Sequence, residues 1–158
     1  MAKEKMSIVV FSGEMDRVMA ALILATTGAA MGMEVNMFFT FWGLNVLRKK
    51  GLTSGRTFLQ KMMNSLNRGG ASRLPLSRFN MLGLGPALMK VMMRQSKVPS
   101  IPELVATAKK LGVRFTACTT TLGFMGFGKE DFIDGVEARA GAATFLGEVL
   151  EGRVSYFI

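Results

Sequence analysis

The chain has 158 residues, of which 49% are hydrophobic and 20% are charged, a balance typical of one globular domain rather than of a disordered segment. It holds a single cysteine and no histidine, which excludes an internal disulfide, a Cys-His pair, a Ser-His-Asp triad and histidine ligands to a metal. No secretory signal is visible at its start. We therefore expect a cytoplasmic protein in a reducing compartment, with no metal and no cofactor.

The first part of the chain alternates between predicted strands and helices. Apolar runs with β-branched residues predict the strands, and apolar residues at helical spacing predict the helices. In chain order these elements are a strand over 6–11, a turn at Ser12-Gly13, a helix over 14–31, a strand over 35–40 and a short helix from 41 to near Lys50. The uncharged run 18–33 is shorter than the roughly 20 residues that cross a membrane, and its small residues favour a buried helix.

The second part resumes the alternation after a long interruption. It predicts a helix over 101–111, a strand over 113–118, a helix capped by Thr119 or Thr120, a short strand over 135–138, a helix over 141–150 and a strand over 153–157. Strands that alternate with helices pair in parallel. We therefore predict one α/β domain over 1–158, a three-layer sandwich with a five-stranded, mainly parallel sheet and flavodoxin-like topology, with a helical, basic, methionine-rich insertion at about 48–98.

The loops after the first three strands should meet beyond the carboxyl ends of those strands, where such folds bind ligands. The candidate site residues on these loops are Ser12, Gly13, Thr40, Trp42, Cys118, Thr119, Thr120 and Thr121. Cys118 lies where a strand ends and a helix begins, a position that lowers the pKa of a thiol and favours the reactive thiolate. The alternative interpretations are an inert buried cysteine, an ordinary turn at Ser12-Gly13 and a core or interface aromatic at Trp42.

Five short stretches of the chain, taken together, resemble those of a known protein family. They are Phe-Ser-Gly-Glu-Met-Asp at 11–16, Gly-Met-Glu-Val-Asn-Met-Phe-Phe-Thr-Phe-Trp-Gly at 32–43, Ala-Cys…Phe-Met-Gly at 117–126, Asp-Gly-Val-Glu at 134–137 and Gly-Ala-Ala-Thr-Phe-Leu at 141–146. With these the sequence resembles the DsrE/DsrF/DsrH-like family of small sulfur-relay proteins. The resemblance implies a five-stranded parallel sheet, a homo-oligomer, and a cysteine that carries sulfur as a persulfide. Cys118 is the one position that can take that role.

Two hypotheses of function follow. In the first, the protein is a sulfurtransferase or sulfur carrier in which Cys118 accepts a sulfane sulfur as a persulfide and passes it to a partner thiol. The backbone N–H groups of 119–121 would stabilise the anion, and Ser12 and Thr40 would be neighbours. Because the chain has no second cysteine, it needs donor and acceptor proteins. In the second, it is a non-catalytic oligomeric binding or scaffold protein with an inert cysteine, which recruits an acidic or membrane-associated partner through its basic insertion. A peroxidase-like role would need an external resolving thiol.

The predicted insertion carries all the positive excess of the chain. No acidic residue occurs between Val35 and Pro102, whereas eleven basic residues occur between Arg48 and Lys97, and the rest of the chain has nine basic and eleven acidic residues. The same segment is rich in methionine, which suits an adaptable apolar surface. It could recruit an acidic protein, a membrane face or a phosphate-bearing ligand. The interpretation that we prefer is a subunit interface with a solvated basic rim. Nucleic acid is not expected, because no binding motif accompanies the charge.

Overall fold

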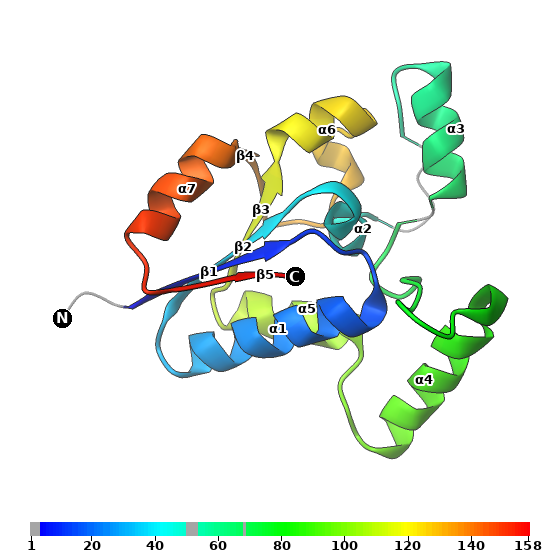
Figure 1. Ribbon diagram of the computed structural model, residues 1–158, viewed down its shortest axis with the longest axis horizontal. Coiled ribbons are helices and arrows are strands. Elements are labelled where there is room, and N and C mark those ends of the chain that lie inside the picture. Colours follow the sequence, from blue (N-terminus) through cyan, green and yellow to red (C-terminus); the bar gives the residue numbers. More distant parts are fainter. Residues whose placement is uncertain (1–3, 50–53, 68) are drawn as a thin grey trace.

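Five strands form a single sheet in the order β4-β3-β2-β1-β5, and each neighbouring pair runs parallel in the computed structural model (Figure 1). The structure describes residues 4–49, 54–67 and 69–158, and for 138 and 139 the backbone alone. The strands are β1 (Lys5–Val10), β2 (Glu34–Phe39), β3 (Arg114–Cys118), β4 (Val136–Ala140) and β5 (Val154–Phe157). The predicted five-stranded parallel α/β sheet is therefore confirmed.

The strand order corrects the flavodoxin-like topology that we predicted, in which the order is 2-1-3-4-5. Here the first four strands follow one another across the sheet, and β5 returns to the free edge of β1. Because parallel crossovers are right-handed, steps in one direction place their helices on the same face. The alternation of strands and helices in a sequence is identical for both orders, so it could not distinguish them.

One face of the sheet is covered by α1 (Met15–Ala30) and α5 (Ile101–Lys110), which lie side by side below the strands in Figure 1. The strands send fully buried apolar side chains into this layer, among them Ile8, Phe39 and Phe115. Each such side chain contributes roughly 1.5–3 kcal/mol when it leaves water. Gly28 lets α1 approach the sheet closely, because a Cβ there would lie 2.9 Å from the Met6 side chain.

The opposite face carries α7 (Ala142–Leu150) and a smaller core in which the rings of Phe38 and Phe145 stack at 4.5 Å. A polar network beside it fixes this helix to the strands. The buried Asn36 amide donates to the Glu148 carboxylate at 2.7 Å, and the Thr116 hydroxyl donates to the Asn36 oxygen at 2.9 Å. Arg114 completes the network with a 2.8 Å ion pair to Glu148.

The remaining helices lie at the carboxyl ends of the strands and beyond. They are α2 (Leu44–Leu47) after a 3₁₀ turn η1 (Phe41–Gly43), α3 (Phe58–Leu66), α4 (Leu84–Gln95) after η2 (Met81–Gly83), and α6 (Thr119–Met125), which is followed by η3 (Lys129–Asp131). Both α3 and α4 project away from the sheet (Figure 1). None of the helices within the described ranges is long and apolar enough to cross a membrane.

The short helix after β2 ends earlier than we predicted. Arg48 is already extended and forms an antiparallel bridge with Phe132, whereas Lys50 lies outside the described residues. The physical reason is the burial of the Arg48 guanidinium, which donates to the Asn67 carbonyl at 2.8 Å and lies 4.4 Å from the centre of the Phe127 ring. These contacts draw the chain away from the helix axis.

Candidate functional site

Cys118 is the last residue of β3 and the N-cap of α6, with an extended backbone at φ −66° and ψ 115°. This corrects the predicted capping by Thr119 or Thr120, because the strand continues one residue further and both threonines already belong to the first helical turn. The side chain lies on the α7 face among Phe38 and Phe145 and is 6% exposed. The thiol is therefore nearly buried, and its sulfur faces the start of α6.

Two threonine hydroxyls meet beside this cysteine. Thr40, which follows β2, and the buried Thr121, in the first turn of α6, have their Oγ1 atoms 2.9 Å apart. The Phe41 amide also donates to Thr121 Oγ1, at 3.5 Å. Phe41 has φ +46°, a left-handed conformation that costs a residue with a side chain roughly 1–2 kcal/mol. The turn after β2 therefore has a strained backbone at Phe41, and it places Thr40 and the Phe41 amide against Thr121.

These groups set the ionisation of the cysteine. Burial alone would raise the pKa of the Cys118 thiol. The nearby donor groups, namely the Thr121 amide and hydroxyl, the Thr40 hydroxyl and the Thr120 amide, outweigh burial and lower the pKa below its ordinary value. All four are donors that favour the anion.

The supply of hydroxyl protons limits how the thiolate is held. Each threonine hydroxyl has one proton, and the contact between Thr40 and Thr121 uses one of the two. One hydroxyl proton is then left for the sulfur at any moment, beside the amides of Thr120 and Thr121. The site therefore provides two fixed donors and one donor that can pass between two hydroxyls.

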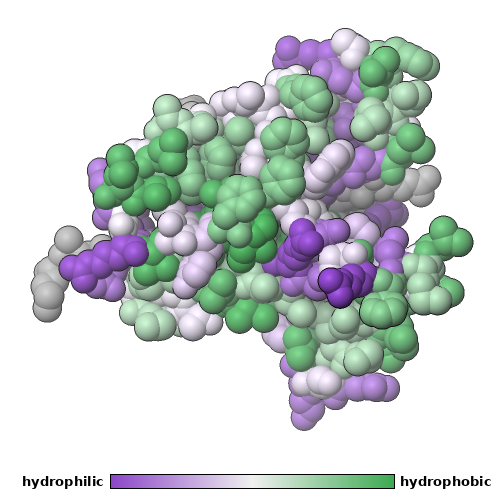
Figure 2. All heavy atoms as spheres, viewed as in Figure 1, coloured by the Kyte–Doolittle hydropathy of each residue, from purple (hydrophilic) through white to green (hydrophobic). Residues whose placement is uncertain are grey.

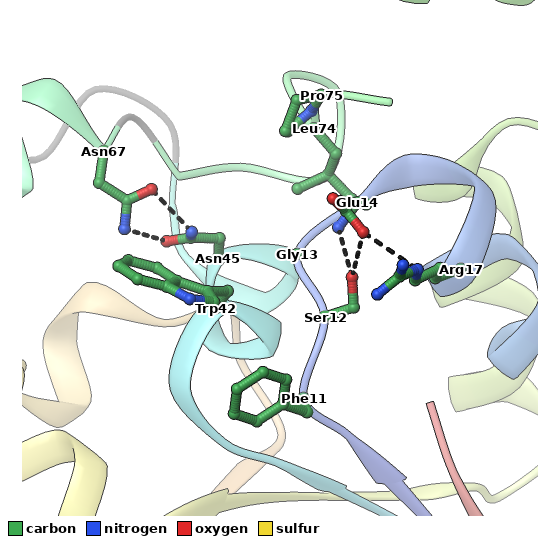
Figure 3. A pocket seen from close by; sticks show the side chains of 10 residues that line it. All are labelled: Phe11, Ser12, Gly13, Glu14, Arg17, Trp42, Asn45, Asn67, Leu74 and Pro75. Carbon is green, nitrogen blue, oxygen red and sulfur yellow. Dashed lines mark hydrogen bonds and ion pairs between the residues drawn. The ribbon is translucent and has the colours of Figure 1, made fainter. Parts of the chain in front are cut away.

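The other predicted site residues lie in a separate pocket of about 390 Å³ beyond the ends of β1 and β2 (Figure 3). Ser12 bonds to the Glu14 carboxylate at 3.1 Å, and that carboxylate pairs with Arg17 at 3.1 Å. Gly13 allows two loops to touch, because a Cβ there would lie 2.6 Å from the Trp42 carbonyl oxygen. Among the hydrogen bonds of the described residues, none joins Ser12 to Cys118.

The structure thus brings Thr40, Thr120 and Thr121 to Cys118, and it assembles Ser12, Gly13 and Trp42 elsewhere. Thr119 is exposed and is not among the groups that shift the thiol pKa. The contribution of the Phe41 amide was missed from the sequence, since a left-handed phenylalanine leaves no signal there. The pocket also contains a reciprocal amide pair that was not predicted, in which Asn45 and Asn67 bond to each other at 2.9 and 3.3 Å.

No group of three or more cysteine, histidine, aspartate or glutamate side chains among the described residues is placed to hold a metal ion. The groups that the candidate site offers for chemistry are the Cys118 thiol and the donors around it. A stabilised thiolate can attack an electrophilic sulfur, and it can also leave readily when another thiolate attacks in turn.

Two curated relatives match over nearly the whole chain. The uncharacterized protein YrkE of Bacillus subtilis strain 168 is 38% identical over 156 residues, which cover 98% of this chain and 97% of the relative. The sulfur carrier protein DsrE2 of Allochromatium vinosum is 35% identical over 161 residues, which cover 100% of both chains.

Solved structures show the same fold at low sequence identity. The protein of unknown function MTH1491 from Methanobacterium thermoautotrophicum has a TM-score of 0.56 at 15% identity and covers 99% of this chain and 100% of its own. The ychN protein from E. coli has a TM-score of 0.55 at 13% identity, with 98% and 99% covered. The model of the DsrE/DsrF/DrsH-like family matches residues 2–157. The chain therefore belongs to this family.

Proposed function

We propose that the protein is a sulfur carrier in a sulfur relay, in which Cys118 holds a sulfane sulfur as a persulfide. The observation that supports this most directly is the set of threonine donors that lowers the pKa of the Cys118 thiol. Membership of the family and the 35% identity to a protein named as a sulfur carrier point in the same direction. Cys118 is also the single cysteine of the chain, so no other residue can carry out this step.

Loading is an exchange of one sulfur–sulfur bond for another. The Cys118 thiolate attacks the terminal sulfur of a neutral donor persulfide, R–S–SH, and the donor thiolate R–S⁻ leaves with its electron pair. The products are Cys118–S–SH and R–S⁻, so no external oxidant or reductant takes part. Unloading is the same exchange with the roles reversed, in which an acceptor thiolate attacks the terminal sulfur and Cys118 leaves as the thiolate.

The threonine donors assist both directions of this exchange. They raise the fraction of thiolate available for loading, and they make Cys118 a better leaving group for unloading, because a thiol of lower pKa leaves faster. Burial of the thiol favours delivery to a partner over loss to solvent. The S–S bond of a persulfide adds about 2 Å to the side chain, which moves the terminal sulfur outward toward an acceptor.

Mass spectrometry of the intact protein tests the proposal. After incubation with a persulfide donor and removal of excess reagent, we expect an added mass of about 32 Da, one sulfur atom, which dithiothreitol removes. Cys118→Ser should show no adduct, and Thr119→Ala, at an exposed position of the same turn, should load like the wild type. A wild-type chain that stays unmodified, or an adduct that persists in Cys118→Ser, would contradict the carrier role.

A further inference from the structure

The outer side of α4 is an apolar surface that the described part of the chain does not cover. Leu84, Leu88, Val91 and Met92 recur at helical spacing and are each 47–70% exposed. The opposite side of the same helix packs on the body of the protein through the buried Pro86 and Met93. The helix thus has two apolar sides, and only one of them serves the fold.

The loop before α4 extends this surface outward. Phe79, Met81 and Leu82 are 65–106% exposed, and all three have left-handed backbone angles. Such angles in residues with side chains cost of the order of 1–3 kcal/mol each, and a fold keeps them where they serve a purpose. Between the loop and the helix lies an apolar hollow of about 710 Å³. We name the loop 79–83 and the outer side of α4 together the α4 surface.

Positive charge surrounds the α4 surface without acidic partners. Arg78 lines the hollow, Arg94 lies in the last turn of α4 and Lys97 follows it; all three are exposed, and the five ion pairs found among the described residues involve none of them. One carboxylate, that of Asp16, lines the hollow, and it is held by the Ser77 amide at 3.0 Å. The surface therefore combines protruding apolar side chains with unpaired cations.

A second element repeats this combination. Helix α3 exposes Phe58, Leu59 and Leu66 at 68–81%, together with Arg56 and Lys61. Both helices project on the same side of the molecule, and hydrophobic side chains occupy their outer parts (Figures 1 and 2). Helices with one apolar side and a basic polar side lie in the interface of membranes. Two such helices on one side of the protein could contact a broad, flat surface at the same time.

We propose that the α4 surface, with α3 beside it, docks the protein on an anionic lipid bilayer. Phe79, Leu82 and Leu84 would enter the boundary between headgroups and acyl chains, and Arg78 and Arg94 would contact the lipid phosphates. A fluid bilayer can fill the hollow and surround the protruding loop at once, whereas a protein partner would need a matching shape. A second copy fits worse, because a two-fold interface would place this basic surface against an identical basic surface.

Sedimentation with vesicles tests this docking on the full chain. We expect binding to vesicles of phosphatidylcholine with phosphatidylglycerol in about 0.1 M salt, little binding to phosphatidylcholine alone, and release in about 1 M salt, where the screening length falls from about 10 to about 3 Å. The pair Arg78→Glu and Arg94→Glu should weaken binding about 30-fold, which corresponds to about 2 kcal/mol. The control pair Lys110→Glu and Lys129→Glu makes the same charge change at exposed residues elsewhere and should have little effect.

The apolar contribution is tested separately. Leu84→Gln with Leu88→Gln should weaken binding at least tenfold, whereas Leu146→Gln with Leu150→Gln, on the exposed side of α7, should not. Leu82→Asn changes a fully exposed side chain at a left-handed residue, so it should reduce binding without lowering the melting temperature. The proposal is wrong if anionic vesicles do not bind the wild type, if the control pairs lose as much binding as the α4 pairs, or if both leucine variants bind normally.

Discussion

The hydroxyl oxygens of Thr40 and Thr121 lie 2.9 Å apart although the two residues are 81 positions apart in the chain. This contact joins the loop after β2 to the first turn of α6. It also decides how many donors the sulfur of Cys118 receives, since the two hydroxyls share their protons between each other and the sulfur. We therefore expect the removal of either hydroxyl to change the pKa of the Cys118 thiol.

The first prediction concerns the thiol itself. Alkylation of Cys118 by iodoacetamide should increase with pH through a midpoint below the free-thiol value of about 8.5, because the threonine donors lower its pKa. Thr121→Val should move the midpoint upward, Thr121→Ser should restore it, and Thr119→Val should leave it unchanged. Equal midpoints in the wild type and in Thr121→Val would show that the hydroxyl does not act on the sulfur.

The same shift links folding to pH. Because the fold lowers the pKa of Cys118 relative to the unfolded chain, the thiolate contributes stability above the unfolded pKa and loses it as the pH falls through the folded pKa. The difference in the free energy of unfolding between the wild type and Cys118→Ser should therefore grow in favour of the wild type as the pH rises from the folded to the unfolded pKa, and then stay level. Urea unfolding of both proteins at a series of pH values measures this difference in the free energy of unfolding. A difference that shrinks as the pH rises over this range would contradict the lowered pKa.

The second prediction concerns the attachment of α7. Glu148→Ala should lower the free energy of unfolding by about 2 kcal/mol, because it leaves the amide of the buried Asn36 without its acceptor. Glu130→Ala, at an exposed position, should change stability by less than about 0.5 kcal/mol. Chemical denaturation of both variants makes the comparison, and similar small losses would mean that the network is not a significant support of the helix.

A third prediction separates two glycines. Gly13→Ala should cost about 1–3 kcal/mol, because the new methyl group would lie 2.6 Å from the Trp42 carbonyl oxygen. Gly123→Ala should instead gain about 0.5–1 kcal/mol, because a Cβ there meets nothing within 4 Å and alanine favours the helix. Thermal melts of the two variants should therefore shift in opposite directions, and a stable Gly13→Ala would show that the loops can separate.

The fourth prediction is that the protein is a homo-oligomer. Phe11 packs against Phe41 at 5.4 Å and against Phe157 at 5.9 Å, yet all three rings stay 37–72% exposed. Exposed apolar groups gathered in this way favour a contact with another chain. Light scattering should give a multiple of 17.2 kDa at micromolar concentration, and Phe157→Glu should reduce it. A single species of monomer mass in the wild type would refute this expectation.

Much of the fold could be predicted because continuous apolar runs indicate buried parallel strands. The boundaries of the strand 5–10 and of the helix 101–110 differ by about one residue from those expected. The strand order could not be predicted, since it depends on where β5 docks and not on its own residues. The proximity of Thr121 to Cys118 could be predicted because the two residues are three positions apart in the sequence. The distance between Ser12 and Cys118 could not, because it depends on how the loops after β1 and β3 are arranged in space.

The pairing of β3 with β4 is irregular beside Cys118, where two steps along β3, from Thr116 to Cys118, match three along β4, from Glu137 to Ala140. Such a bulge bends and twists the strand that carries the extra residue. Because β4 is an edge of the sheet, its outer hydrogen-bonding groups are then poorly aligned to receive a strand from another molecule. The bulge therefore disfavours edge-to-edge pairing with another sheet at the end of β4 that lies beside Cys118.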